Sequence, residues 1–143
     1  MPTILLQTDT TVGFLSQESE TLFEIKSRQQ IKPFLKLYSS FRSFKADCNR
    51  VPTSQKKLVR RSKKTTFVVK NRAFRVVKLS LNSQIIRDFS WQYSTSANES
   101  GKKFDYKFCE EKSDIIIEDK RGLTEQNSST ILKINSKKIG KLR

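Results

Sequence analysis

The chain has 143 residues, of which 35% are hydrophobic and 30% charged, and its 29 Lys and Arg against 14 Asp and Glu leave a net charge of +15. This length suits one domain with a real core, and the charge favours an anionic partner: a nucleotide, RNA or an acidic surface. Because the chain contains no histidine, Ser-His-Asp catalysis, Cys-His catalysis and most zinc sites are excluded.

Two observations concern the cellular compartment. No apolar run approaches the length of a membrane span, and residues 2–11 do not form a secretory signal. The two cysteines, Cys48 and Cys109, are isolated and lack metal-ligand spacing, which favours free thiols in a reducing compartment. We therefore expect a cytoplasmic protein with no membrane partner.

Hydrophobic periodicity predicts short strands and helices in alternation. In the first half of the chain we expect a strand at 3–6, a turn closed by Gly13, a helix at 19–26, a strand at 34–38, a helix at 41–48 and a basic helix from 52 to 61. In the second half we expect strands at 65–69 and 73–77, a helix capped by Asn82, a strand at 91–95, a helix at 103–112, and strands at 114–118 and 129–134. This alternation indicates a single α/β domain, residues 1–143, with a mixed sheet.

Four polar clusters fall at predicted strand ends or helix starts. They are Thr8-Asp9-Thr10, Lys26-x-Arg28 with Lys32, residues 94–101, and Ser129-Thr130. Loops beyond strand ends form the usual binding edge of an α/β sheet, and cations with hydroxyls suit phosphate oxygens. The sequence has neither a P-loop nor a Rossmann glycine motif.

The third cluster reads S-T-S-A-N-E-S-G. Its hydroxyls and its amide can donate several hydrogen bonds to one anion, and Gly101 permits a close backbone approach. By composition alone the same letters also describe a surface turn.

The basic run at 55–64, Q-K-K-L-V-R-R-S-K-K, carries six positive charges. A solvated helix face and an RNA contact both fit this run. It contains no aromatic residue for base stacking, so nothing in it indicates sequence readout.

Taken in order, these segments resemble the YrdC-like family, whose enzymes are L-threonylcarbamoyladenylate synthases. The resemblance rests on T-D-T-T-V-G at 8–13, K-S-R at 26–28 with K-P-F-L at 32–35, T-F-V-V at 66–69, A-F-R-V at 73–76, S-T-S-A-N-E-S-G at 94–101, residues 114–122, S-T-I at 129–131 and L-R at 142–143. It covers almost the whole chain and implies a twisted mixed sheet, flanked by short helices, around a concave basic cleft.

The resemblance also implies a nucleotidyltransferase reaction. ATP, expected with Mg²⁺, bicarbonate and L-threonine would give threonylcarbamoyl-AMP and pyrophosphate, the first step toward threonylcarbamoyladenosine in tRNA. Downstream threonylcarbamoyl-transfer proteins would use the product, and no protein side chain is expected to bind a metal.

Residue by residue, the match implies three groups of site residues. The catalytic cations would be Lys26 and Arg28. The ATP-binding residues would be Arg28, Lys32, Ser94, Asn98, Ser100 and Arg143. The threonine-binding residues would be Thr8, Thr10, Arg75, Ser96 and Ser129.

Two other functions fit the same sequence. One is a non-catalytic module that binds tRNA, ribosomal RNA or double-stranded RNA, favoured by the charge of +15 and the basic run. The other is a carbamoyl-adenylate reaction on a different acceptor, since the family fold also occurs inside hydrogenase-maturation proteins.

Overall fold

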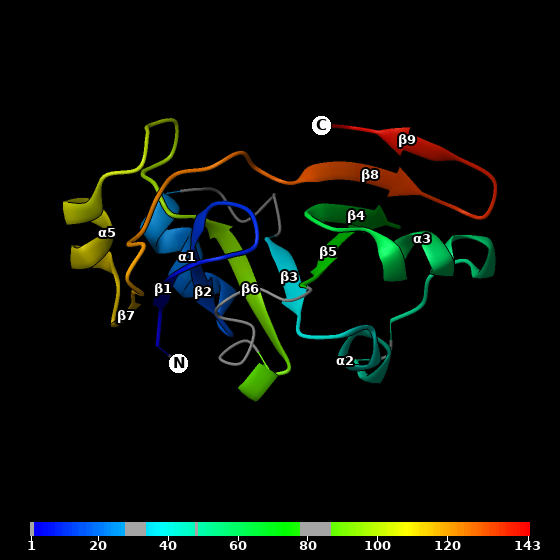
Figure 1. Ribbon diagram of the computed structural model, residues 1–143, viewed down its shortest axis with the longest axis horizontal. Helices are drawn as coiled ribbons and strands as arrows, with labels where there is room; N and C mark the ends of the chain where they lie inside the picture. The colour runs from blue at the N-terminus through cyan, green and yellow to red at the C-terminus, as the bar shows by residue number, and fades with distance from the viewer. Residues whose placement is uncertain (1, 28–33, 48, 78–86) are drawn as a thin grey trace.

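The computed structural model describes residues 2–27, 34–47, 49–77 and 87–143 (Figure 1). In chain order the elements are β1 (Ile4–Gln7), β2 (Val12–Ser16), α1 (Ser19–Lys26), β3 (Leu35–Tyr38), α2 (Phe41–Ala46), the 3-10 helix η1 (Thr53–Gln55), α3 (Lys56–Arg61), β4 (Thr65–Val69), β5 (Arg72–Val76), β6 (Trp91–Ser96), α5 (Tyr106–Lys112), β7 (Ile115–Ile117), β8 (Thr130–Ile134) and β9 (Ile139–Lys141). None of the helices in these residues is long and apolar enough to cross a membrane.

The strands form one mixed sheet in the order β7-β1-β2-β6-β3-β5-β4-β8-β9. Three neighbouring pairs are parallel, β1 with β7, β3 with β5, and β4 with β8, and the others are antiparallel. The α/β fold class predicted from the sequence is therefore confirmed. The predicted helix at 19–26 coincides with α1 and the predicted strand at 65–69 coincides with β4.

The turn prediction at Gly13 is wrong, because Gly13 lies inside β2, a strand that the sequence pattern did not predict. A side chain at this position would crowd the sheet: a Cβ there would lie 3.1 Å from the Thr95 carbonyl oxygen and 3.3 Å from Thr8 Cγ2. Glycine is therefore needed for close approach rather than for a turn.

Other boundaries differ by a few residues. The predicted strand at 114–118 shortens to Ile115–Ile117, and the predicted helix at 103–112 begins at Tyr106 after the N-cap Asp105, whose carboxylate accepts from Lys107 N at 3.1 Å. The short edge strand β9 was not expected. The helix predicted to begin at Asn82 falls largely on residues 78–86, outside the described part.

Among the described residues, three apolar clusters pack on the sheet, and two of them include residues of the helices α1, α2, α3 and α5. Leu22 and Ile25 of α1 and Cys109 of α5 pack with Leu5 and Phe14 of β1 and β2. At the other half of the sheet, Phe44 of α2 and Val59 of α3 pack with residues of β4 and β5, and the Phe44 and Phe74 rings stack at 4.2 Å between centroids.

The alternation of side chains along β4 and β5 divides the sheet into two faces. Phe67 and Phe74, paired across the two strands, face the cluster under α2 and α3. Thr66 and Arg75, one residue away on each strand, therefore point to the opposite face. That face carries the polar pocket described next.

Candidate functional site

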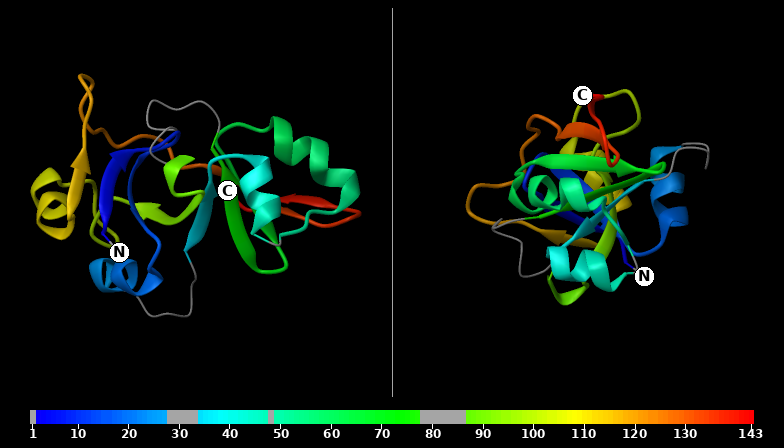
Figure 2. Two further views of the ribbon diagram at one scale, coloured as in Figure 1. Left: turned by 90° about the horizontal axis from the view of Figure 1, so that it is seen from below. Right: turned by 90° about the vertical axis from the view of Figure 1, so that its right-hand side faces the viewer.

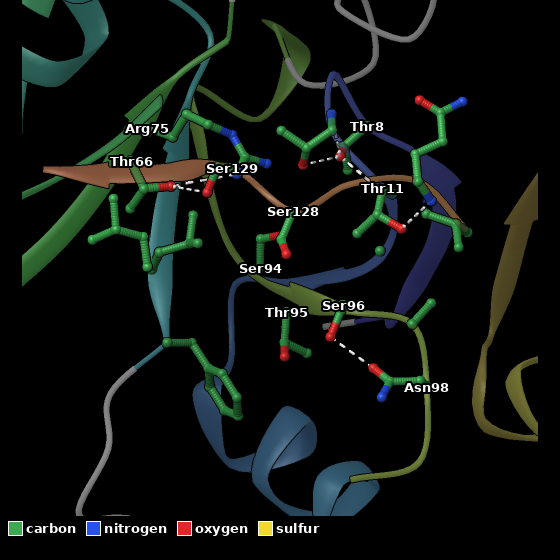
Figure 3. A pocket seen from close by; sticks show the side chains of 18 of the residues that line it. Thr8, Thr11, Thr66, Arg75, Ser94, Thr95, Ser96, Asn98, Ser128 and Ser129 are labelled. Carbon is green, nitrogen blue, oxygen red and sulfur yellow. Dashed lines mark hydrogen bonds between the residues drawn. The ribbon is translucent and has the colours of Figure 1, made fainter. Parts of the chain in front are cut away.

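A polar pocket with a volume of about 390 Å³ opens on the face of the sheet away from α2 and α3. Three groups of residues form its walls: the β1–β2 turn, the end of β6 with the residues that follow it, and side chains of β4, β5 and the segment leading into β8 (Figure 3). The lining includes eight of the site residues expected from the sequence: Thr8, Thr10, Arg75, Ser94, Ser96, Asn98, Ser129 and Arg143.

The first wall is built around a buried arginine. Arg75 Nε lies 3.1 Å from Asp9 Oδ1, and both side chains are less than one-tenth exposed. Arg75 Nη1 donates to Thr66 Oγ1 at 3.4 Å, and the Thr66 hydroxyl lies 2.7 Å from Ser129 Oγ. This arrangement fixes the guanidinium plane, because the ion pair and the hydroxyl hold two edges of the group.

A second arginine stands at the same wall. Arg143 Nε donates to the Ser129 carbonyl at 3.0 Å and Nη2 donates to Ser129 Oγ at 3.4 Å. Burial lowers the pKa of the Arg75 guanidinium; Asp9 opposes that change, and the positive charge of Arg143 adds to it. Two guanidinium groups beside one pocket repel each other, and a bound carboxylate or phosphate would relieve that repulsion.

The β1–β2 turn, whose Asp9 pairs with Arg75, forms the adjoining wall. Thr8 Oγ1 donates to the Thr11 carbonyl at 2.6 Å, accepts from the Thr10 amide at 3.2 Å and lies 3.2 Å from Thr10 Oγ1. The Thr11 hydroxyl accepts a hydrogen bond from the backbone N–H of Gln126 at 3.0 Å, which connects the turn to the segment before β8. Backbone groups thus hold the hydroxyls of Thr8 and Thr11, and the Thr8 hydroxyl in turn contacts that of Thr10 in the lining of the pocket (Figure 3).

The third wall is the end of β6 and the loop after it. Ser94 is buried, and Ser96 Oγ donates to Asn98 Oδ1 at 2.6 Å. The Asn98 amide nitrogen donates to the carbonyls of Glu99 at 3.0 Å and Lys102 at 2.6 Å. These bonds give the loop one defined conformation, so that its polar groups meet a ligand already oriented.

Lys26 lies behind this loop and is not among the pocket-lining residues. Its side chain is buried at 4% exposure, and Nζ donates to the carbonyls of Ser96 at 3.0 Å and Asn98 at 2.8 Å and to Asn98 Oδ1 at 2.8 Å. Ser100, also outside the lining, donates from Oγ to the Lys26 carbonyl at 2.7 Å. The structure therefore places both residues as supports of the 96–100 loop.

Two expected site residues, Arg28 and Lys32, lie outside the described residues. Among the residues that are described, no group of three or more Cys, Asp and Glu stands close enough to hold a metal ion.

Sequence reasoning did not single out Thr66, Thr11 or Ser128, which also line the pocket. A sequence signal for Thr66 was present. In T-T-F-V-V it is a polar residue next to the apolar residues of a predicted strand, and it lies on the same face of the sheet as Arg75 of the neighbouring strand. Thr11 and Ser128 are polar loop residues with no comparable pattern.

The fold and the pocket define an α/β domain with a polar site across one face of a mixed sheet. The Sua5, YciO and YrdC family model, described as telomere recombination, matches residues 3–143, and the chain belongs to this family. No curated protein sequence matches the chain.

Solved structures share the fold at low sequence identity. A P. abyssi Sua5 variant (H234A/Y235A in its own numbering) aligns with a TM-score of 0.79 at 19% identity, covering 99% of this chain and 49% of that one. P. abyssi Sua5 complexed with L-threonine aligns with a TM-score of 0.76 at 19% identity, covering 99% and 50%. MTH1692 from Methanobacterium thermoautotrophicum aligns with a TM-score of 0.67 at 19% identity, covering 92% and 74%.

Full-length HypF in a phosphate- and nucleotide-bound form also aligns, with a TM-score of 0.71 at 13% identity over 99% of this chain and 26% of that one. The chain thus spans about half the length of the Sua5 proteins and about a quarter of HypF.

Proposed function

We propose that the chain is an L-threonylcarbamoyladenylate synthase that forms threonylcarbamoyl-AMP and pyrophosphate from ATP, bicarbonate and L-threonine. The observation that carries the proposal is the convergence of eight expected site residues, drawn from five separate parts of the chain, on one pocket of about 390 Å³. Membership of the family and the fold shared with a threonine-bound Sua5 support it.

The threonine end of the site is assigned to the wall that contains Arg75. A guanidinium carries five N–H donors, and Asp9 and Thr66 face two of its nitrogens. The remaining donors suit an α-carboxylate, since charge-assisted bonds of this kind contribute about 1.5–3 kcal/mol each. The hydroxyls of Thr8 and Thr10 suit the small polar side chain of threonine.

The nucleotide end is assigned to the 94–100 loop and Arg143. Ser94 would donate to the nucleotide, and Arg143 would pair with phosphate oxygens. Both hydrogens of the Asn98 amide nitrogen are already donated to the carbonyls of Glu99 and Lys102, so Asn98 would hold the loop in place together with Lys26 and Ser100. By the family pattern Arg28 and Lys32 would add phosphate contacts. Mg²⁺ would arrive on the ATP phosphates, and no protein ligands are proposed for it.

The reaction balances without a histidine base. The threonine amine attacks the carbon of bicarbonate and a water is released, which gives a carbamate. A carbamate oxygen then attacks the α-phosphorus of ATP, an O–P bond forms, and the bond to the pyrophosphate oxygen breaks. The arginines would stabilise the charge that develops on the phosphate oxygens.

The decisive variant is Arg75→Gln, with Arg72→Gln as its control. Both residues belong to β5, but Arg72 is exposed and lies on the other face of the sheet. Arg75→Gln leaves the buried Asp9 carboxylate unpaired and can therefore unfold the protein. The double variant Asp9→Asn/Arg75→Gln replaces the ion pair by two neutral side chains, so that threonine binding can be measured in a folded protein without Arg75. We expect both Arg75 variants to bind threonine at least tenfold more weakly, and Arg72→Gln to keep the wild-type affinity.

The assays are calorimetric titration with L-threonine and release of pyrophosphate from ATP in the presence of bicarbonate. Wild-type threonine affinity in the folded double variant would overturn the assignment of Arg75. Absence of pyrophosphate release in the wild type would overturn the activity. Pyrophosphate release that does not depend on threonine would instead indicate a different acceptor.

A further inference from the structure

The large exposed apolar side chains of the described residues lie at the two ends of the sheet. Ile115, 42% exposed, belongs to the edge strand β7, and Tyr106, 41% exposed, lies beside it because its hydroxyl donates to Glu118 Oε2 at 3.4 Å. Ile139 and Leu142, 54% and 60% exposed, lie in the other edge strand, β9, and directly after it. The left panel of Figure 2 shows the two edge strands at opposite ends of the molecule. Apolar surface gathered at both open edges indicates that each edge takes a further strand.

The two edges carry opposite charge. Residues 110–119, which include the end of α5 and β7, contain five Asp and Glu and one Lys, a net charge of −4. Residues 133–141, which include the β8–β9 turn and β9, contain four Lys and no Asp or Glu, a net charge of +4. Like charges beside an edge strand repel a second copy of the same edge. The β9 edge of one molecule and the β7 edge of another attract each other instead.

The β9 strand turns backbone groups outward. Asn135 N donates to the Lys138 carbonyl at 3.1 Å in the turn between β8 and β9. Antiparallel pairs alternate between hydrogen-bonded and non-hydrogen-bonded positions. Counted from this pair, the peptide groups of Gly140 face β8, whereas the N–H and C=O groups of Ile139 and Lys141 face the open edge.

The β7 strand presents one residue in the same way. Ile115 N donates to the Thr3 carbonyl, just before β1, at 3.1 Å. Because successive residues of a strand turn their peptide groups to alternate sides, the N–H and C=O groups of Ile116 point away from β1. An antiparallel partner for Ile116 is a residue whose own peptide groups face outward, and Lys141 of a second copy is such a residue.

One antiparallel register fits the charges of both edges. In this register Lys141 of one copy lies opposite Ile116 of the next. Asp114 and Glu118 stand two residues to either side of Ile116, so they project from the same face of the strand. Lys141 would therefore lie diagonally between two carboxylates, at a separation that its long side chain can span.

The same register brings exposed apolar side chains together, because Leu142 then lies opposite Ile115. Both project from the pocket face of the sheet. Leu142 N donates to the carbonyl of Ile131, which lines the pocket, at 2.8 Å. Ile115 is paired with Ile4, which belongs to the same apolar cluster as the pocket-lining Leu35. Two largely exposed side chains would thus cover each other.

The net charge of +15 does not prevent this contact. The nine strands leave eight spacings of about 4.8 Å, which separates the two edges of one copy by about 38 Å along the sheet. Exposed charges farther apart than the Debye length, about 8 Å at physiological ionic strength, are largely screened. The opposite charges at the two edges therefore govern the contact.

We propose that the chain associates head-to-tail with further copies of itself, β9 of one molecule adding to β7 of the next. Because the two surfaces in contact differ, each added copy leaves one edge of each kind open, and the assembly grows with protein concentration instead of stopping at a dimer. The proposal does not depend on the reaction assigned to the pocket, since none of Ile115, Glu118, Ile139 and Lys141 lines it.

The test reverses the charges that this register brings together. Lys141→Glu alters the β9 edge and Glu118→Lys alters the β7 edge. Lys70→Glu, in the exposed link between β4 and β5, makes the same change of charge away from both edges and is the control. Sedimentation velocity over a concentration series and a salt series measures association, after nuclease treatment so that no polyanion bridges the copies.

We expect the wild type and Lys70→Glu to form species larger than a dimer as the concentration rises, and rising salt to weaken this association. Each edge variant alone should associate roughly tenfold more weakly or less, since like charges then meet at the contact. An equal mixture of Lys141→Glu and Glu118→Lys should regain the association, because each variant keeps the edge that is altered in the other.

A second pair of variants tests the backbone contact without changing any charge. Ile139→Pro removes an N–H that faces the open edge and leaves the bonds to β8 in place. Ile139→Val keeps that N–H and is its control. We expect weaker association for Ile139→Pro than for Ile139→Val, with the same circular dichroism spectrum for both.

A wild type that stays monomeric at every concentration, or that stops at a dimer, would overturn the proposal. So would a mixture of the two charge variants that associates no better than either alone, or equal association of Ile139→Pro and Ile139→Val. Pyrophosphate release should be the same in all of these variants as in the wild type, so the assembly and the proposed reaction fail separately.

Discussion

Replacing Lys26 by methionine gives the sharpest test of how the site is held together. Methionine keeps much of the apolar stem but removes the three hydrogen bonds from Nζ to the carbonyls of Ser96 and Asn98 and to Asn98 Oδ1. Each bond from a charged donor contributes about 1.5–3 kcal/mol. Since Ser96 is exposed and Asn98 is half-buried, water can replace part of this stabilisation, and we expect the free energy of unfolding to fall by about 2–4 kcal/mol.

The measurement is urea unfolding without any ligand, with Lys103→Met as the control because Lys103 is exposed. A lysine that only contacts phosphates would leave the stability of the ligand-free protein unchanged, and its replacement would weaken ATP binding alone. Replacing a lysine that holds the loop lowers both the stability of the ligand-free protein and its affinity for ATP. An unfolding free energy of Lys26→Met within about 0.5 kcal/mol of the wild type would refute the supporting role.

Two further predictions follow from titratable groups. Burial would raise the pKa of Asp47, but hydrogen bonds from Tyr38 and Lys36 outweigh this effect and lower the pKa. The destabilisation caused by Asp47→Asn should therefore be largest at neutral pH and shrink as the pH falls below about 4. Acid unfolding curves of the wild type and of Asp47→Asn measure this difference. An unchanged difference between pH 7 and pH 2 would contradict that assignment. Burial raises the pKa of the Cys109 thiol to about 11, so iodoacetamide at pH 8 should modify Cys109 slowly in the folded protein and rapidly in urea. The mass of the peptide that contains Cys109 reports the extent of modification. Equal rates in the folded and unfolded protein would show that the thiol is accessible.

The sequence predicted the parts of the site that depend on local pattern. β-Branched and aromatic runs such as residues 65–69 predicted strands whose bounds the structure confirms, and the order of the polar clusters pointed to residues that line one pocket. Strand β2 was missed because the hydrophilic residues before it and Gly13 are typical of a turn. Glycine is needed at position 13 because a side chain there would crowd the Thr95 carbonyl, on a strand about eighty residues later, as well as the nearby Thr8.

The role of Lys26 shows the same limit. Within the motif K-S-R it is typical of a solvated or phosphate-binding cation, but α1 ends against β6 and turns its Nζ into the loop at 96–98. Arg75 likewise has the sequence pattern of a free cation, whereas the fold places it beside Asp9 in a buried pair. Contacts across such sequence separations carry no local signal.

By itself the sequence determined the fold class, the family resemblance, the absence of histidine chemistry and the total charge, because periodicity, motif order and composition are properties of the chain alone. Only the tertiary structure decided which polar groups share a pocket, which cations are buried as supports, and where the charge gathers. The reason is the pairing of β4 with β8, which places two basic segments, more than fifty residues apart, on one end of the molecule.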